Sequence, residues 1–509
     1  MASKLGKPDI THLPAETLIL IFSRLDYRGM IALRKCCRTF QHAIRDSAEL
    51  RYIIALAAAG LCEDGSASGD LTSAELLDKL GRYEKAWKSM HWTEHIVLRS
   101  KPGERISAPS NPLIWQSRPE GRPQLRLFYA PSHLRDAVQH EWEIPMNGYP
   151  VFSYLFHMTH DLVVVQTADV PRPRFYFLML SSGDPHPDAH LHTLLESDQV
   201  MFGLLLTRQY LIIPSDTGKQ TVINWRTGRH VTHVMCNYYS VGFLDDDHLL
   251  VLPPPEQESG PCMLVYRLQP EPVKVIMAFG LPSFTAGHSM QDCTIKCAPC
   301  GSYHLPHLPH ADRFVADPID QLLTVGISEH NTAASYELVV HARALLAYLP
   351  VVSVSQTPVF IPWDHWGVTR SHIYIAIPPP RVGWLSNCIF GSRRITIRPR
   401  RRAVDDLLVA DVWDYNARRI GCTRLLQDTI DASSRPWAVH DSDTVNNIWL
   451  TEGGPLVTRL PHIKVEMPLP EELQHRRPEE ISLYINDNGV IACTDRVDGT
   501  PSVAHVLVF

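Results

Sequence analysis

The sequence lacks the marks of a secreted or membrane-embedded protein. No Asn-x-Ser/Thr acceptor for N-glycosylation occurs in its 509 residues. Residues 1–9 are polar, unlike a signal peptide, and the apolar stretch Tyr52–Leu61 is too short to cross a bilayer. The eleven cysteines, an odd number, are scattered and form no disulfide framework for so long a chain. We therefore expect reduced thiols and a location in the cytoplasm, the nucleus or both.

Common enzyme motifs are missing as well. Gly218 and Lys219 lack the upstream glycine and the following Ser or Thr of a phosphate-binding loop. Residues 287–291 resemble a nucleophile elbow but lack its final glycine. The formal net charge of −6 gives no general attraction to nucleic acid or to an anionic membrane. We therefore expect a non-catalytic protein with no cofactor and no membrane contact, and the composition disfavours a nucleic-acid partner.

The overall composition favours a folded protein with many short strands. Hydrophobic residues make up 45% of the chain and charged residues 20%, which is typical of a well-packed globular protein. The chain has 40 prolines against 27 glycines. Because proline is excluded from the interiors of helices and strands, this balance indicates short elements joined by proline-bearing loops. A chain of this length is also too long for one compact core unless that core is a large β architecture.

From residue 93 to residue 509 the sequence alternates short apolar runs with turn residues, which predicts an all-β domain. The runs form weakly similar pairs. The first runs, which begin polar and become apolar, are residues 161–166, 210–213, 247–252, 321–325 and 406–409. The second runs are residues 174–178, 221–225, 262–266, 336–340 and 412–415.

Paired strands that end in an aromatic residue and a tight turn are typical of propeller blades whose repeats have diverged. The final residues, Val503–Phe509, read as a strand that needs a neighbour, and ring closure would supply one. About 415 residues at roughly 45–60 residues per blade predict six to eight blades. A divergent β-propeller is therefore the favoured fold, with paired β-sandwiches or another irregular β architecture as alternatives.

The chain before residue 93 reads as helical, with a break. Residues 9–60 are expected to form a small helical domain, and residues 61–92 a linker with a connecting helix. Residues 62–70 are small and acidic, which predicts a hinge. From Thr72 to Trp92 the apolar residues return at steps of three and four, which predicts a helix.

Residues 13–44 carry the most informative pattern. Pro14 suits the first turn of a helix, and the apolar residues Leu18, Ile21, Phe22 and Leu25 follow at helical spacing. A second short helix would follow Asp26 and Tyr27, and a third would run from near Arg38 towards Leu56. Three short helices have little core of their own, so some of the apolar groups must face outward and meet a partner.

This segment resembles the F-box. The positions of that pattern are filled in order by Leu13, Pro14, Glu16, Ile21, Leu25, Asp26, Leu33, Cys37, Arg38 and Phe40. Cys36 stands where a valine is usual, and Phe40 stands where a tryptophan is usual. The whole arrangement also looks like the large F-box family of basidiomycete, mushroom-forming fungi. An ordinary helical hairpin that caps a β domain is the structural alternative.

The resemblance implies an α+β multidomain protein, with a three-helix F-box followed by a large all-β domain. It implies a substrate-recognition adaptor of an SCF-type cullin–RING ubiquitin ligase, whose F-box binds a Skp adaptor while the β domain binds a target protein. The alternative is an F-box protein that acts outside the ligase as a scaffold or regulatory protein. The expected Skp contacts are Leu13, Pro14, Glu16, Leu18, Ile19, Ile21, Phe22, Leu25, Leu33, Cys37 and Phe40.

Six arginines lie within ten residues and form a possible substrate-binding or nuclear-import patch. Such a run could hold a phosphorylated peptide through bidentate hydrogen bonds, or bind nucleic acid. The simplest interpretation is a solvated loop between strands. The arginines are Arg393, Arg394, Arg398, Arg400, Arg401 and Arg402.

A second cluster gathers cysteine and histidine within eighteen residues. Its Cys-x-x-Cys spacing is found in zinc sites, but prolines separate its histidines. We favour a long surface loop with no bound metal, and zinc binding is the alternative. The residues are Cys293, Cys297, Cys300, His304, His307 and His310.

Overall fold

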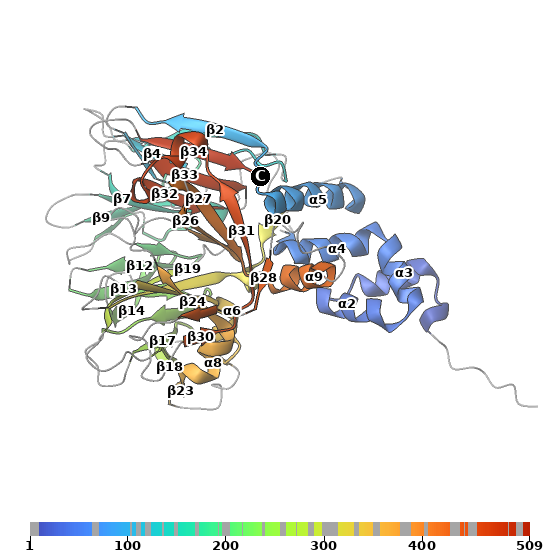
Figure 1. Ribbon diagram of the computed structural model, residues 1–509. Coiled ribbons are helices and arrows are strands. Elements are labelled where there is room, and N and C mark those ends of the chain that lie inside the picture. Colours follow the sequence, from blue (N-terminus) through green and yellow to red (C-terminus); the bar gives the residue numbers. More distant parts are fainter. Residues whose placement is uncertain are drawn as a thin grey trace, which may run out of the picture.

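The computed structural model shows a helical N-terminal part attached to a large β domain (Figure 1). Within the described residues, no helix combines the length and the apolar composition needed to span a membrane. The structure describes residues 10–509 except 64–70, 102–103, 108–112, 118–123, 135–136, 147–150, 168–172, 192, 196–203, 216, 237–239, 255–260, 271, 283–289, 298–313, 330–334, 350–356, 377–387, 402–405, 428–437, 442, 446–455, 487 and 495–501.

The N-terminal part is a bundle of four short helices that follow a 3-10 turn at Ile10–His12. Ser47 divides the expected third helix in two, because its side chain caps a new helix by accepting a hydrogen bond from the Leu50 N–H. Asp26 caps the second helix in the same way through the Gly29 N–H, at 2.8 Å. The helices of this helical bundle are α1 (Ala15–Phe22), α2 (Tyr27–Cys36), α3 (Arg38–Asp46) and α4 (Ala48–Ala59).

The helical bundle has a hydrophobic core of its own. The rings of Phe22 and Phe40 meet edge to face, with centroids 5.1 Å apart. In Figure 1 the helix α3 lies at the side of the molecule furthest from the β domain. The bundle is therefore packed internally rather than folded back onto the strands. Its buried residues are Leu18, Phe22, Met30, Phe40, Ile44 and Leu50.

The expected hinge is partly a strand. Leu61–Glu63 forms β1, which pairs antiparallel with β20 (Phe314–Ala316) of the β domain. The hinge prediction is therefore wrong for residues 62–63, and residues 64–70 lie outside the described residues. The helix expected after the hinge is confirmed as α5 (Ser73–Ser89), which begins with a capping box formed by Thr72 and Glu75.

The β domain consists of seven sheets of four or five strands in the part of the chain that the structure describes, arranged as a propeller (Figure 1). Each sheet is built mainly from strands that follow one another in the chain. The first three sheets are β3 (Glu104–Ser107), β4 (Leu113–Ser117), β5 (Gln124–Tyr129) and β6 (His140–Pro145); β7 (Val151–His157), β8 (Leu162–Thr167), β9 (Arg174–Met179) and β10 (Thr193–Leu195); and β11 (Leu205–Leu206), β12 (Tyr210–Pro214), β13 (Lys219–Asn224) and β14 (Arg229–Met235).

Of the next three sheets, the fourth and the sixth have a fifth strand. The fourth contains β15 (Val241–Phe243), β16 (His248–Val251), β17 (Cys262–Arg267) and β18 (Lys274–Gly280), with β23 (Val359–Ile361) parallel to β18. The fifth contains β19 (Met290–Cys297), β21 (Leu322–Glu329), β22 (Ser335–His341) and β24 (Ser371–Ala376). The sixth contains β25 (Ile389–Phe390), β26 (Arg393–Arg401), β27 (Asp406–Asp414), β31 (His462–Pro468) and β28 (Ala438–His440). A separate pair consists of β29 (Asp443–Val445) and β30 (Leu456–Thr458).

The seventh sheet closes the ring. It joins β32 (Ile481–Ile485), β33 (Gly489–Thr494) and β34 (Val503–Val508) to β2 (Glu94–Arg99), the first strand of the β domain. The strands β2 and β34 are antiparallel and pair along their full length. The expectation that the last strand finds its neighbour through ring closure is confirmed, and so is the propeller fold.

Four of the five predicted strand pairs are confirmed as antiparallel neighbours: β8 with β9, β12 with β13, β16 with β17, and β21 with β22. The fifth is wrong, because residues 406–409 and 412–415 lie along one strand, β27, and the residue that ends it. Asp411, which lies between the two runs, is buried inside this strand. Its carboxylate is held by Arg398 at 2.7 Å and by Lys464 at 2.9 Å.

Helices inserted in the β domain were not predicted. Trp363 and Trp366 lie on one of these helices, where the Trp366 indole N–H donates to the Gly280 carbonyl at 2.9 Å. The inserted helices are α6 (Ala342–Leu346), α8 (Trp363–Arg370), α9 (Ala417–Gln427) and α10 (Glu471–Gln474), with 3-10 turns at Met158–His160, Pro318–Asp320 and Pro478–Glu480.

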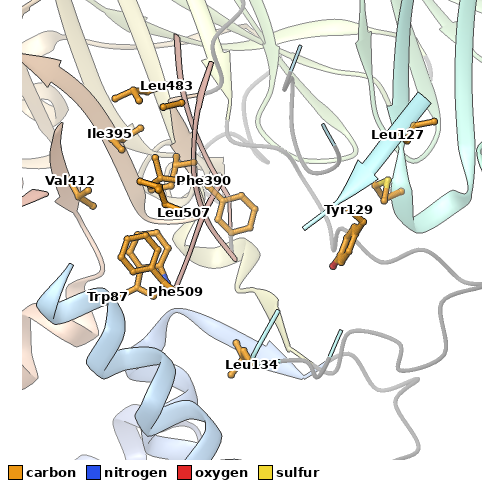
Figure 2. Close-up of a cluster of buried hydrophobic side chains, with 14 of the residues drawn as sticks. Trp87, Leu127, Tyr129, Leu134, Phe390, Ile395, Val412, Leu483, Leu507 and Phe509 are labelled. Atoms are coloured by element: carbon orange, nitrogen blue, oxygen red, sulfur yellow. The ribbon is translucent and has the colours of Figure 1, made fainter. Parts of the chain in front are cut away.

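The last residue joins the propeller to α5. The rings of Trp87 and Phe509 are stacked with centroids 4.4 Å apart, inside the hydrophobic cluster that also contains Phe390 and Leu507 (Figure 2). Trp87 and Phe509 are both almost fully buried. The closing strand and α5 therefore share one core.

We predict that Phe509→Ala lowers the free energy of unfolding by about 3 kcal/mol, because it leaves a cavity against Trp87. Urea denaturation of the full chain, monitored by circular dichroism, measures the change. The control is Val138→Ala, because Val138 is 78% exposed and its truncation removes no buried contact. Equal stability of Phe509→Ala and Val138→Ala would contradict the role of the stack.

Candidate partner-binding surface

Four large apolar side chains stay exposed around α1. Leu20 and Ile21 lie on the helix, Leu13 just precedes it and Leu25 follows its end. Their exposed fractions are 38% for Leu13, 62% for Leu20, 38% for Ile21 and 37% for Leu25. We call these four residues the apolar face. A group of large apolar side chains exposed this close together is typical of a protein-binding surface.

The predicted contact residues divide into two groups. Leu13, Pro14, Glu16, Ile21 and Leu25 are exposed on and around α1. The other six residues are buried or half-buried and pack in or against the core of the helical bundle: Leu18, Phe22, Phe40, Ile19, Leu33 and Cys37.

Leu20 is not among the predicted contact residues, although it is the most exposed member of the apolar face. A signal for it was present in the sequence. Leu18 and Phe22 are four residues apart and share the buried side of α1. Leu20, two residues from each of them, must then point to the opposite side of the helix.

The helical bundle is fixed to the propeller through the C-terminus of α4. Three carbonyls of its last turn accept hydrogen bonds from side chains that begin α9: Ala58 from Asn416 at 3.0 Å, and Ala57 and Ala59 from two arginines at 3.3 Å. These arginines are Arg418 and Arg419. Positive side chains are favourable at this end of a helix, where unpaired carbonyls concentrate negative charge.

Gly60 allows this close approach. It ends α4 with a φ of +72°, in the left-handed region. A Cβ on Gly60 would lie 2.8 Å from the Asn416 side-chain nitrogen. Glycine therefore serves both the backbone turn and the contact with the propeller.

A buried cluster of charges completes the joint. Arg419 pairs with Asp414 at the end of β27 and with Glu84 on α5. Arg393 lies 3.6 Å from Asp414, donates to the Tyr83 hydroxyl at 2.8 Å and covers the Trp87 ring. Burial alone would raise the pKa of Asp414, but the charges of Arg419 and Arg393 outweigh it and lower that pKa. Burial alone would lower the pKa of Arg419, but the carboxylates of Asp414 and Glu84 outweigh it and raise that pKa.

The arginine run lies in a strand, so the solvated-loop interpretation is wrong for residues 393–401. Besides Arg393, Arg394 is buried against Glu337 at 2.7 Å and covers the Tyr374 ring. Arg398 and Arg400 pair with Glu466 at 2.8 and 3.2 Å. Four of the six arginines thus contact carboxylates. Arg402 and the side chain of Arg401 lie outside the described residues.

The cysteine and histidine cluster is only partly described. Cys293 and Cys297 belong to β19, so this part is a strand and not the expected loop. Within the described residues, no three His, Cys, Asp or Glu side chains gather as a metal site. The remaining members lie outside the described residues: Cys300, His304, His307 and His310.

Comparison with known proteins identifies the N-terminal part. Residues 10–52 match the family model of the F-box domain, which covers the 3-10 turn, α1, α2, α3 and the start of α4. The chain therefore joins an F-box domain to a β-propeller. The likeness to the F-box pattern of residues 13–44 is confirmed. No curated protein matches the chain as a relative.

Solved structures that resemble the chain include several propellers at low similarity. The WD40 domain of Toxoplasma gondii coronin has a TM-score of 0.35 and 7% identity, covering 82% of this chain and 88% of that chain. The C-terminal WD40 domain of Sif2 has a TM-score of 0.32 and 7% identity, covering 81% and 99%. A chain of the S. cerevisiae Dbp5 assembly with Nup159 and Gle1 has a TM-score of 0.33 and 10% identity, covering 81% and 94%. The sheet order and the β2–β34 pair define the propeller independently of them.

We predict that Arg419→Ala destabilises the joint by about 3–5 kcal/mol, because it removes the cation closest to the Asp414 and Glu84 carboxylates and leaves them with the more distant Arg393, at 3.6 and 3.9 Å. The free energy of unfolding is measured by urea denaturation. Arg82→Ala on α5 is the matched control, since the Arg82–Asp78 pair is more than two-thirds exposed and should contribute little. Losses of similar size in both variants would contradict a special role of the buried cluster.

Proposed function

We propose that this chain is the substrate-recognition adaptor of an SCF-type cullin–RING ubiquitin ligase. The observation that carries the proposal is the apolar face, exposed on a bundle that already has its own core and matches the F-box domain. In this proposal the apolar face binds the Skp adaptor, together with the exposed Pro14 and Glu16. The buried residues Leu18, Phe22 and Phe40 support the face from beneath.

The propeller binds the target protein in this proposal. The joint between the helical bundle and the propeller keeps the Skp-binding surface and the target-binding domain at a fixed distance from each other. An adaptor accelerates ubiquitin transfer by raising the effective concentration of a target lysine near the loaded conjugating enzyme. That effect needs a fixed geometry and no catalytic residue of its own. The capped end of α4 and the buried cluster around Arg419 supply such a geometry.

The proposal also covers the source organism, the cellular location and the domain boundaries. The resemblance to the basidiomycete F-box family suggests a fungal protein. The scattered cysteines of the chain suggest that it is located in the reducing cytoplasm or nucleus. We propose residues 9–60 as the F-box domain, 61–92 as the connection and 93–509 as the target-binding domain.

We predict that Leu20→Asp with Ile21→Asp reduces binding of the Skp adaptor at least about 100-fold, because two charges replace the centre of the apolar face. Leu13→Ala with Pro14→Ala should weaken binding in the same direction. The measurement is co-purification, followed by titration of the purified full chain with the Skp adaptor.

The control for this experiment is Val138→Asp, which places a charge on an exposed apolar residue of the propeller. It should bind the Skp adaptor as the wild type does. Circular dichroism checks that each variant keeps its fold. Unchanged Skp binding by the folded Leu20→Asp/Ile21→Asp variant would refute the proposed surface.

A second prediction separates the ligase from a scaffold that uses the Skp adaptor only for stability. If the chain acts in the ligase, neddylated cullin co-purifies with it, and its bound target accumulates when the proteasome is blocked. Both signals should disappear in the Leu20→Asp/Ile21→Asp variant. Skp binding without cullin and without any accumulating partner would favour the scaffold.

A further inference from the structure

A basic cavity lies between the helical bundle and the propeller. Its volume is about 370 Å³, within the range of small-molecule sites. Arg28 enters it from α2, Arg343 from α6, Arg370 from the end of α8 and Arg424 from α9. None of the residues that line the cavity is an aspartate or a glutamate.

The four arginines are only partly neutralised. Arg343 lies 3.4 Å from Asp320, which it shares with Arg418, and Arg424 pairs with Asp441. Among the described residues, Arg28 and Arg370 have no ion pair, and both are exposed. The cavity therefore carries an excess of positive charge that its own acidic neighbours do not balance. Guanidinium groups that line one cavity repel one another unless an anion joins them.

We propose that this cavity binds a small anion that carries several phosphate groups. Planar guanidinium groups form paired hydrogen bonds to phosphate oxygens, and four of them can hold more than one phosphate. A volume of about 370 Å³ leaves room for a chain of three phosphates. The lining comes from both sides of the joint rather than from an open face of the propeller, which favours a small ligand over a phosphorylated peptide.

The bound anion would join the two domains. Arg28 belongs to the F-box domain, whereas Arg343, Arg370 and Arg424 belong to the propeller. A ligand that contacts both adds to the contacts at the end of α4 and stabilises the folded chain by mass action. This role does not involve the Skp adaptor, so its failure would leave the proposed adaptor function untouched.

The test is a calorimetric titration of the purified full chain with tripolyphosphate, with inorganic phosphate and sodium chloride at matched ionic strength for comparison. We expect tripolyphosphate to bind and to raise the melting temperature, and the comparison salts to do neither. Arg28→Ala with Arg370→Ala should weaken binding at least about tenfold, because it removes the two unpaired charges. Both side chains are exposed, so the fold should be kept.

The matched control is Arg45→Ala with Arg82→Ala. It removes the same total charge from exposed positions on α3 and α5 outside the cavity. This variant should bind tripolyphosphate as the wild type does. Three results would overturn the proposal: no binding beyond that of the salts, equal weakening in both double variants, or binding of a doubly phosphorylated peptide where tripolyphosphate does not bind.

Discussion

The charges buried between α5 and the sixth sheet hold the two parts of this molecule together. Arg419 reaches Glu84 from one side and Asp414 from the other, while Arg393 lies over Trp87. Such charges are costly to bury, and they are tolerated only where each meets its partner with good geometry. The cost restricts the position of α5, because a small rotation of this helix would separate Glu84 from Arg419. A hydrophobic contact alone would permit more sliding between the two parts.

The same joint explains why local patterns in the sequence misled at particular residues. The acidic residues 62–70 suggested a hinge, but β1 extends into them as far as Glu63 because β20, more than 250 residues later, offers a pairing edge. The arginine run suggested a solvated loop, yet Arg393 and Arg394 face half-buried carboxylates from α5 and β22. In both cases the partner lies far along the chain. Composition within a short window contains no information about such a partner.

Features that depend on near neighbours were predictable. The periodicity of α5, the strand pairs such as β12 with β13, and the helices after Pro14 and Asp26 all rest on contacts within about twenty residues. Within the partner-binding surface, the spacing identified Ile21 and Leu25, but the buried side of α1 also took Leu18 and Phe22. The pattern could mark α1 as amphipathic, but it could not decide which stripe meets the bundle. That choice depends on Phe40 and Met30, which complete the core from other helices.

Ring closure has a consequence for the order of folding. The Thr93 hydroxyl donates to the Val508 carbonyl across 415 residues of sequence, whereas the contacts of the helical bundle are local. Local contacts form quickly, and the long loop between β2 and β34 must be closed before the seventh sheet exists. During synthesis the N-terminal helices would thus be assembled well before the propeller is complete. Because Phe509 follows the final strand and stacks on Trp87, this contact between α5 and the propeller forms only after that strand is made.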